Sequence, residues 1–189
     1  MTSRDQILAK VKQNQPQSVS LPDLSILGKE SFDSVTKFVE TAVAIGAEVI
    51  EIQDFSEIQT YINSKYSGKT IRSTLADFNS ENWLALSPKE LDGTDFLLIK
   101  ARFGVAENGS IWIADKDLGQ RIAPFITEYL GVILDKSKII NTMHQAYQII
   151  GDEDYGFGLF LAGPSKTADI EQSLVLGAHG ARGLVIFLF

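Results

Sequence analysis

The chain has 189 residues, 44% of them hydrophobic and 22% charged, and a net charge of −7. This length and composition predict a single globular domain with a sizeable core and argue against wholesale disorder. Because an acidic chain repels phosphate backbones, we do not expect a dedicated nucleic-acid binder.

The sequence has no cysteine and two histidines, His144 and His179. These counts exclude structural disulfides, thiolate zinc sites, iron–sulfur ligation by this chain and cysteine nucleophiles. With no HExxH pattern, no metal site is expected, nor a cofactor of the chain's own. No apolar run approaches the roughly 20 residues that span a bilayer, and no signal-peptide core follows Met1. We therefore expect a cytoplasmic protein without a membrane span.

Residues 1–13 are predicted to form a helical arm and residues 14–30 a linker. Ile7, Leu8 and Val11 recur at helical spacing in the arm, and the linker is rich in proline, serine and asparagine. An amphipathic helix this short is marginal alone and has to pack somewhere. The arm therefore favours docking on a partner, and a homodimer joined through it is one expected assembly.

Residues 31–189 are predicted to form one α/β domain. It opens with an amphipathic helix that ends at Gly46, and residues 47–52 follow at once as a strand. Asp54 and Glu57 then form a capping-box-like start of a second helix. This helix–strand–helix order is typical of α/β proteins and not of all-α bundles or β-sandwiches.

The centre of the chain, residues 94–115, contains two β-rich runs on either side of Asn108-Gly109, a favoured hairpin turn. The segment YLGVILD, residues 129–135, predicts another strand, and residues 141–150 predict a helix.

The last segment reads as a β-loop-α-β unit. Residues 157–163 and 182–189 are near-continuous apolar runs, typical of strands covered on both faces. Between them lie the loop GPSKT, residues 163–167, and a predicted helix over 168–180. The unit is predicted to be a complete crossover, and such crossovers are right-handed in nearly all cases.

The GPSKT loop carries groups that suit a small carboxylate or phosphate. Loops at the carboxyl ends of strands bind ligands in open α/β sheets, and the first turn of a helix presents unpaired N–H groups. Lys166 adds a full positive charge, and Ser165 and Thr167 add hydroxyl groups. A Walker A loop is excluded, because Ser165 stands where that motif needs a glycine.

A plain helix start explains the same residues without a ligand. Ser165 or Thr167 would then be the N-cap, Asp169 and Glu171 would complement the helix dipole, and Lys166 would be solvated. His179 similarly fits either a C-capping role or a place in the site. The full set of candidate ligand-binding residues is Gly163, Ser165, Lys166, Thr167, Asp169 and His179.

Glu107 is the candidate catalytic residue, because it lies beside the sharp turn at Gly109. A carboxylate held rigidly next to a glycine can act as a nucleophile or a base. The alternative is a solvated glutamate in an ordinary hairpin.

Residues 163–189, GPSKTADIEQSLVLGAHGARGLVIFLF, resemble the C-terminal signature of the LUD domain family, which includes lactate utilization protein C. The central segment with its Ala106-Glu107-Asn108-Gly109 turn and the opening helix SRDQILAKVK are also similar to that family.

The resemblance implies an α/β three-layer sandwich similar to the sugar-isomerase/CoA-transferase fold. Class I CoA transferases carry their catalytic glutamate in a serine-glutamate-asparagine-glycine turn, which implies that Glu107 lies at the ancestral site, with Ala106 in place of the serine. The resemblance also implies a part in the oxidation of L-lactate to pyruvate with separate iron–sulfur partner proteins. Two alternatives stay open: a CoA-transferase-like or ligase-like enzyme that uses Glu107, and a non-catalytic ligand-binding or assembly protein.

Overall fold

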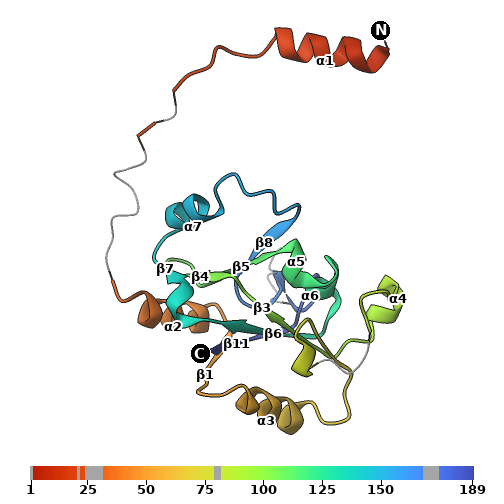
Figure 1. Ribbon diagram of the computed structural model, residues 1–189, viewed down its shortest axis with the longest axis vertical. Coiled ribbons are helices and arrows are strands. Elements are labelled where there is room, and N and C mark those ends of the chain that lie inside the picture. Colours follow the sequence, from red (N-terminus) through yellow and green to blue (C-terminus); the bar gives the residue numbers. More distant parts are fainter. Residues whose placement is uncertain (1, 21, 24–31, 79–81, 168–174) are drawn as a thin grey trace.

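The computed structural model describes residues 2–20, 22–23, 32–78, 82–167 and 175–189 of the chain. Its elements form an α/β fold in which helices flank a mostly parallel sheet, and the N-terminal helix stands apart from the body (Figure 1). The α/β class expected from the sequence is confirmed.

The described helices are α1 (Ser3–Gln13), α2 (Ser34–Ala44), α3 (Ser56–Lys65), α4 (Pro88–Leu91), α5 (Asp115–Leu118), α6 (Ala123–Ile126) and α7 (Met143–Ile150), with the 3₁₀ turns η1 (Ala76–Phe78) and η2 (Lys136–Lys138). The described strands are β1 (Glu48–Glu51), β2 (Ile71–Ser73), β3 (Phe96–Lys100), β4 (Phe103–Val105), β5 (Ser110–Ala114), β6 (Tyr129–Leu134), β7 (Ile139–Ile140), β8 (Gly158–Leu161), β9 (Lys166–Thr167), β10 (Val175–Leu176) and β11 (Gly183–Leu188).

The central sheet has the strand order β1-β11-β6-β3-β2, and every neighbouring pair runs parallel. Residues 184–188 of β11 and 130–134 of β6 are buried along their whole length. Continuous burial explains why these strands are near-continuous apolar runs, as expected for a parallel sheet covered on both faces. The strands predicted over 47–52, 129–135 and 182–189 are confirmed.

Alternate side chains of the central strands pack on opposite faces of the parallel sheet. On one face, Leu97 belongs to the same core as Phe38 of α2. On the other face, Leu98 packs with Ile58 of α3. The sheet is therefore a middle layer, with α3 on one side and α2 and the second sheet on the other (Figure 1).

The second sheet has the order β7-β4-β5-β8 and contains the predicted hairpin. β4 and β5 pair antiparallel, and the Gly109 N–H donates to the Val105 carbonyl at 2.9 Å. Gly109 has φ of +66°, a backbone conformation that is strained for residues with a side chain. This explains the glycine of the Asn-Gly pair at this turn. Ala146 and Ile150 of α7 pack with β4 and β5.

The predicted crossover between residues 157–163 and 182–189 is wrong. β8 pairs antiparallel with β5 in the second sheet, whereas β11 lies inside the parallel sheet. All four residues of β8 are only half-buried, so its apolar run reflects one edge of a small sheet and not a covered central strand. The two strands belong to different sheets, and the handedness rule for parallel crossovers does not apply to them.

The helix predicted over 168–180 does not extend to its expected end. Residues 168–174 lie outside the described residues, but Val175–Leu176 form β10, which pairs antiparallel with β9. The Gly177 N–H donates to the Ser165 carbonyl at 3.0 Å and so continues this narrow ladder. Cross-strand hydrogen bonds therefore replace helical ones in the described part.

Side-chain caps fix several of the predicted helices. Glu57 accepts hydrogen bonds from the N–H groups of Gln53 and Asp54 at 2.8 and 3.1 Å at the start of α3. Thr142 and Gln145 form a capping box at the start of α7. None of the α1 residues is buried. Among the described helices, none combines the length and the apolar character that crossing a membrane would need.

Candidate functional site

The GPSKT loop lies at the amino-terminal edge of the parallel sheet. The Ser165 N–H donates to the carbonyl of Ala181, just before β11, at 2.8 Å. Gly163 has φ of +70°, and a Cβ there would lie 2.7 Å from the carbonyl oxygen of Ile45, just before β1. The expectation that this loop occupies the carboxyl edge is wrong, because the preceding strand β8 belongs to the other sheet.

Lys166 is held at the end of a helix. Its ammonium donates a hydrogen bond to the carbonyl of Ile45, the C-cap residue of α2. The last carbonyls of a helix lack intrahelical partners and attract cations, so this contact fixes an otherwise exposed side chain. No ion pair joins Lys166 to a carboxylate of the described residues, so its charge is not neutralised by them.

A hollow of about 270 Å³ brings several candidate residues together. Gly163, Ser165, Lys166 and His179 all line it, and the His179 N–H donates to Ser165 Oγ at 3.4 Å. The remaining lining residues are Pro124, Phe125, Leu130, Phe160, Leu161, Ala162, Pro164, Gly180, Ala181 and Leu184. Thr167 lies in β9 and does not line the hollow, and Asp169 lies outside the described residues.

The chemistry of this hollow differs from the expected helix start. Lys166 and Thr167 are in a strand, and the Ser165 N–H is already bonded to a backbone carbonyl. Recognition of an anion would therefore depend on the Lys166 ammonium and the Ser165 hydroxyl, with His179 exposed at the rim and no free helix amides from the described loop.

Glu107 is exposed and does not line this hollow. Its Oε2 accepts a hydrogen bond from the Met143 N–H at 2.8 Å, so the carboxylate sits at the amino terminus of α7. The turn at Gly109 and the GPSKT loop both lie against the side chain of Ile45. Cβ atoms added at Gly109 and at Gly163 would lie 3.2 and 3.3 Å from its carbons. The polar groups of Glu107 and Lys166, however, are engaged by the ends of two different helices.

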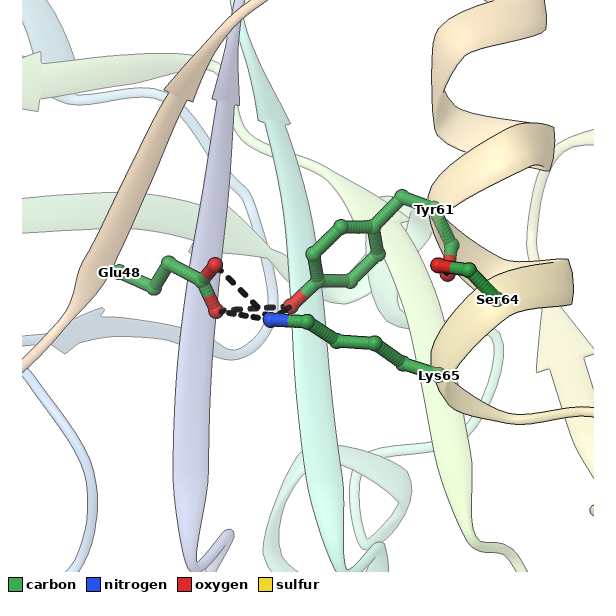
Figure 2. Close-up of polar contacts among 4 residues, drawn as sticks. All are labelled: Glu48, Tyr61, Ser64 and Lys65. Carbon is green, nitrogen blue, oxygen red and sulfur yellow. Dashed lines mark hydrogen bonds and ion pairs between the residues drawn. The ribbon is translucent and has the colours of Figure 1, made fainter.

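A larger hollow, of about 600 Å³, adjoins the first and was missed by the sequence reasoning. Leu184 lines both hollows. In the larger one, Tyr61 and Lys65 extend from α3 toward Glu48 of β1 (Figure 2). The Tyr61 hydroxyl donates to a Glu48 carboxylate oxygen at 2.8 Å, and Lys65 Nζ lies 3.0 Å from both oxygens. The i, i+4 spacing of Tyr61 and Lys65 was the available signal, but nothing in the sequence pointed to Glu48.

Aromatic rings and a second ion pair, between Lys69 Nζ and Asp95 at 3.2 Å, also belong to this larger hollow. The Tyr66 ring lies 4.5 Å from that of Phe96 and 5.5 Å from that of Tyr129, and burial raises the pKa of its phenol. Asp95 accepts a hydrogen bond from the Thr70 N–H at 2.8 Å, which lowers the pKa of its carboxyl group. Within the described parts of the chain, no group of histidine, aspartate and glutamate side chains is arranged to hold a metal ion.

Residues 88–189 match the family model of the LUD domain. The chain belongs to the LUD domain family. The matched segment contains Glu107, the GPSKT loop and His179, whereas Glu48, Tyr61 and Lys65 precede it.

Curated relatives of this LUD domain protein include an uncharacterized protein of Neisseria meningitidis, 33% identical over 63% of this chain and 55% of its own length. Two proteins named lactate utilization protein C also match. The one from Anoxybacillus flavithermus is 38% identical over 40% of this chain and 35% of its own length, and the one from Geobacillus kaustophilus is 30% identical over 51% and 44%. The matched segment thus spans between about a third and just over half of these relatives.

The LUD fold is also seen in a crystal structure of a DUF162 family protein from Deinococcus radiodurans. It superposes with a TM-score of 0.64 at 16% sequence identity and covers 82% of this chain and 96% of that one. At this identity the likeness concerns the fold alone.

Proposed function

We propose that this LUD domain protein is a component of lactate utilization that binds a small carboxylate or phosphate anion in the 270 Å³ hollow beside the GPSKT loop. The observation that carries the proposal is the position of Lys166. Lys166 is one of the residues that line the hollow, and its ammonium donates to the Ile45 carbonyl and has no carboxylate partner among the described residues. The names of the curated relatives support lactate utilization as the setting.

The lining suits a small organic anion better than a large one. Leu130, Phe160 and Leu184 supply an apolar wall that would contact a methyl group, while Lys166 and Ser165 supply a charge and a hydroxyl for the carboxylate. L-lactate and pyruvate each combine a methyl group with a carboxylate. The hollow thus offers complementary surfaces to both ends of such a molecule.

Oxidation of L-lactate to pyruvate removes two electrons and two protons, and an acceptor has to take the electrons. This chain has no cysteine with which to ligate an iron–sulfur cluster. We therefore propose that iron–sulfur partner proteins accept the electrons and that this chain contributes anion binding. Co-purification with cysteine-rich proteins encoded beside its gene is the expected result, and their absence from the purified complex counts against the partnership.

Calorimetric titration with L-lactate, pyruvate and inorganic phosphate tests the anion site. We expect binding of at least one of them by the wild-type chain and at least tenfold weaker binding by Lys166→Ala, because the main positive charge is lost. Lys37→Ala is the matched control, since Lys37 is an exposed lysine of α2 away from the hollow, and it should bind like wild type. No binding by the wild-type chain, or equal binding by both variants, would overturn the proposal.

A further inference from the structure

The apolar face of α1 is exposed in the isolated chain. Ile7, Leu8 and Val11 are 63%, 52% and 56% exposed, and they lie on one side of the helix, with Val11 between the other two around its axis. Figure 1 shows α1 apart from the body of the molecule. A helix of this length is marginal without tertiary contacts, so its apolar face needs a surface to cover it.

The body offers a groove of matching character between β7 and α7. Its volume is about 480 Å³, and it is lined by Ile139, Ile140, Asn141, Gln145, Gln148 and Ile149. Three of these residues are isoleucines and none is charged. Ile149 is 56% exposed even though it is a large apolar side chain of a helix, so α1 of the same chain does not cover it.

The arm and the chain as a whole carry net charges of opposite sign. The arm carries Arg4, Lys10 and Lys12 against one acidic residue, whereas the whole chain has a net charge of −7. Close to the groove in the sequence the charges are mixed, since Lys138 precedes Ile139 and the exposed Asp152 and Asp154 follow the end of α7 at Ile150. The basic last turn of α1, with Lys10 and Lys12, is therefore attracted to the acidic body of a second copy as a whole.

We propose that α1 of a second copy of this chain docks its Ile7, Leu8 and Val11 face into the Ile139–Ile140–Ile149 groove. A reciprocal exchange of arms between two copies gives a closed two-fold dimer, in which helix-in-groove packing occurs twice. The segment 14–33 that tethers α1 could span up to roughly 66 Å when extended, at about 3.3 Å per residue, which is enough to reach a neighbour. This inference is independent of the anion site.

Sedimentation velocity of the full chain over a concentration series tests the exchange. We expect a monomer–dimer equilibrium for the wild type. Leu8→Asp on the arm and Ile149→Asp in the groove should each raise the dimer dissociation constant at least tenfold, while both retain the wild-type circular dichroism spectrum. Leu84→Asp is the matched control, because Leu84 is 54% exposed and lies outside the groove.

A mixing experiment identifies the occupant. Leu8→Asp chains keep an intact groove and Ile149→Asp chains keep an intact arm, so an equimolar mixture restores one arm–groove pair per dimer. Dimer formation in the mixture, but in neither variant alone, supports exchange between copies. A strictly monomeric wild type would overturn the proposal. So would a dimer that both variants leave unchanged, which would indicate another dimer surface. A mixture that stays monomeric would also overturn it and would indicate that the arm docks within its own chain.

Discussion

The phenol of Tyr61 is partly buried against the parallel sheet, where its ring packs edge-on to Phe187 at 5.2 Å. Burial raises the pKa of Tyr61 above its ordinary value near 10, and the hydrogen bond to the Glu48 carboxylate raises it further. The folded state therefore holds this proton more tightly than the unfolded state does. The resulting stabilisation is fully present below about pH 10 and is lost as the pH rises through the folded-state value.

We expect Tyr61→Phe to remove one late-ionising phenol from a spectrophotometric titration at alkaline pH. The free energy of unfolding of the variant should also fall less steeply above about pH 10 than that of wild type, because one proton-linked contribution is gone. Tyr147→Phe is the control, since Tyr147 is 64% exposed and lies on α7. If the free energy of unfolding fell equally steeply above about pH 10 in Tyr61→Phe and in wild type, this account of the Tyr61–Glu48 hydrogen bond would be contradicted.

At the scale of the element, Glu107 acts on α7. Its carboxylate accepts the Met143 N–H at 2.8 Å, one of the backbone donors that a helix leaves unpaired in its first turn. Glu107→Gln keeps an oxygen acceptor but removes the charge that the helix dipole favours. We expect a loss of roughly 0.3–1 kcal/mol in urea unfolding, with anion binding unchanged. Glu40→Gln, on the exposed side of α2, should leave stability near wild type.

Glu107 stays a predicted catalytic residue, and the same variant separates that prediction from the helix-terminal role. Full stability of Glu107→Gln combined with loss of an acyl-transfer activity on acyl-CoA would favour catalysis. Reduced stability with no such activity in the wild type would favour the contact with α7.

The elements that the sequence predicts well are those fixed by local chemistry. The hairpin at Asn108-Gly109 follows from the left-handed conformation at Gly109, and α3 begins where the Glu57 carboxylate meets two backbone N–H groups. The strand over 182–189 is also evident, because a run of residues buried on both faces is almost wholly apolar.

The sequence does not reveal which distant strands pair and which helices pack on them. The run before Gly163 predicts a strand, but whether it joins β5 or β11 depends on packing across the whole domain. Because β8 pairs with β5, the GPSKT loop lies at the amino edge of the parallel sheet and not at the carboxyl edge that the sequence predicts. The hollow around Tyr61 was missed for the same reason, since Glu48 and Tyr61 meet only when β1 and α3 pack together.

At the scale of the whole molecule, the hollows of about 600 and 270 Å³ lie next to each other at one edge of the parallel sheet. Gly46, just after α2, lines the larger hollow, and a Cβ added there would lie 3.2 Å from the Nζ of Lys166, a residue that lines the smaller one. The groove between β7 and α7 has no lining residue in common with these hollows. An anion at the sheet edge and an arm in the groove therefore have room to bind at the same time.

Removal of residues 1–30, the predicted arm and linker, tests how far the body depends on them. No residue of α1 is buried, so the truncated and full chains should unfold at the same temperature in dilute solution. At higher concentration only the full chain should gain thermal stability, because assembly stabilises the folded state by mass action. Scanning calorimetry at several concentrations measures both effects. A truncated chain that melts lower at every concentration would show that the arm stabilises its own body, since stabilisation within one chain does not depend on concentration.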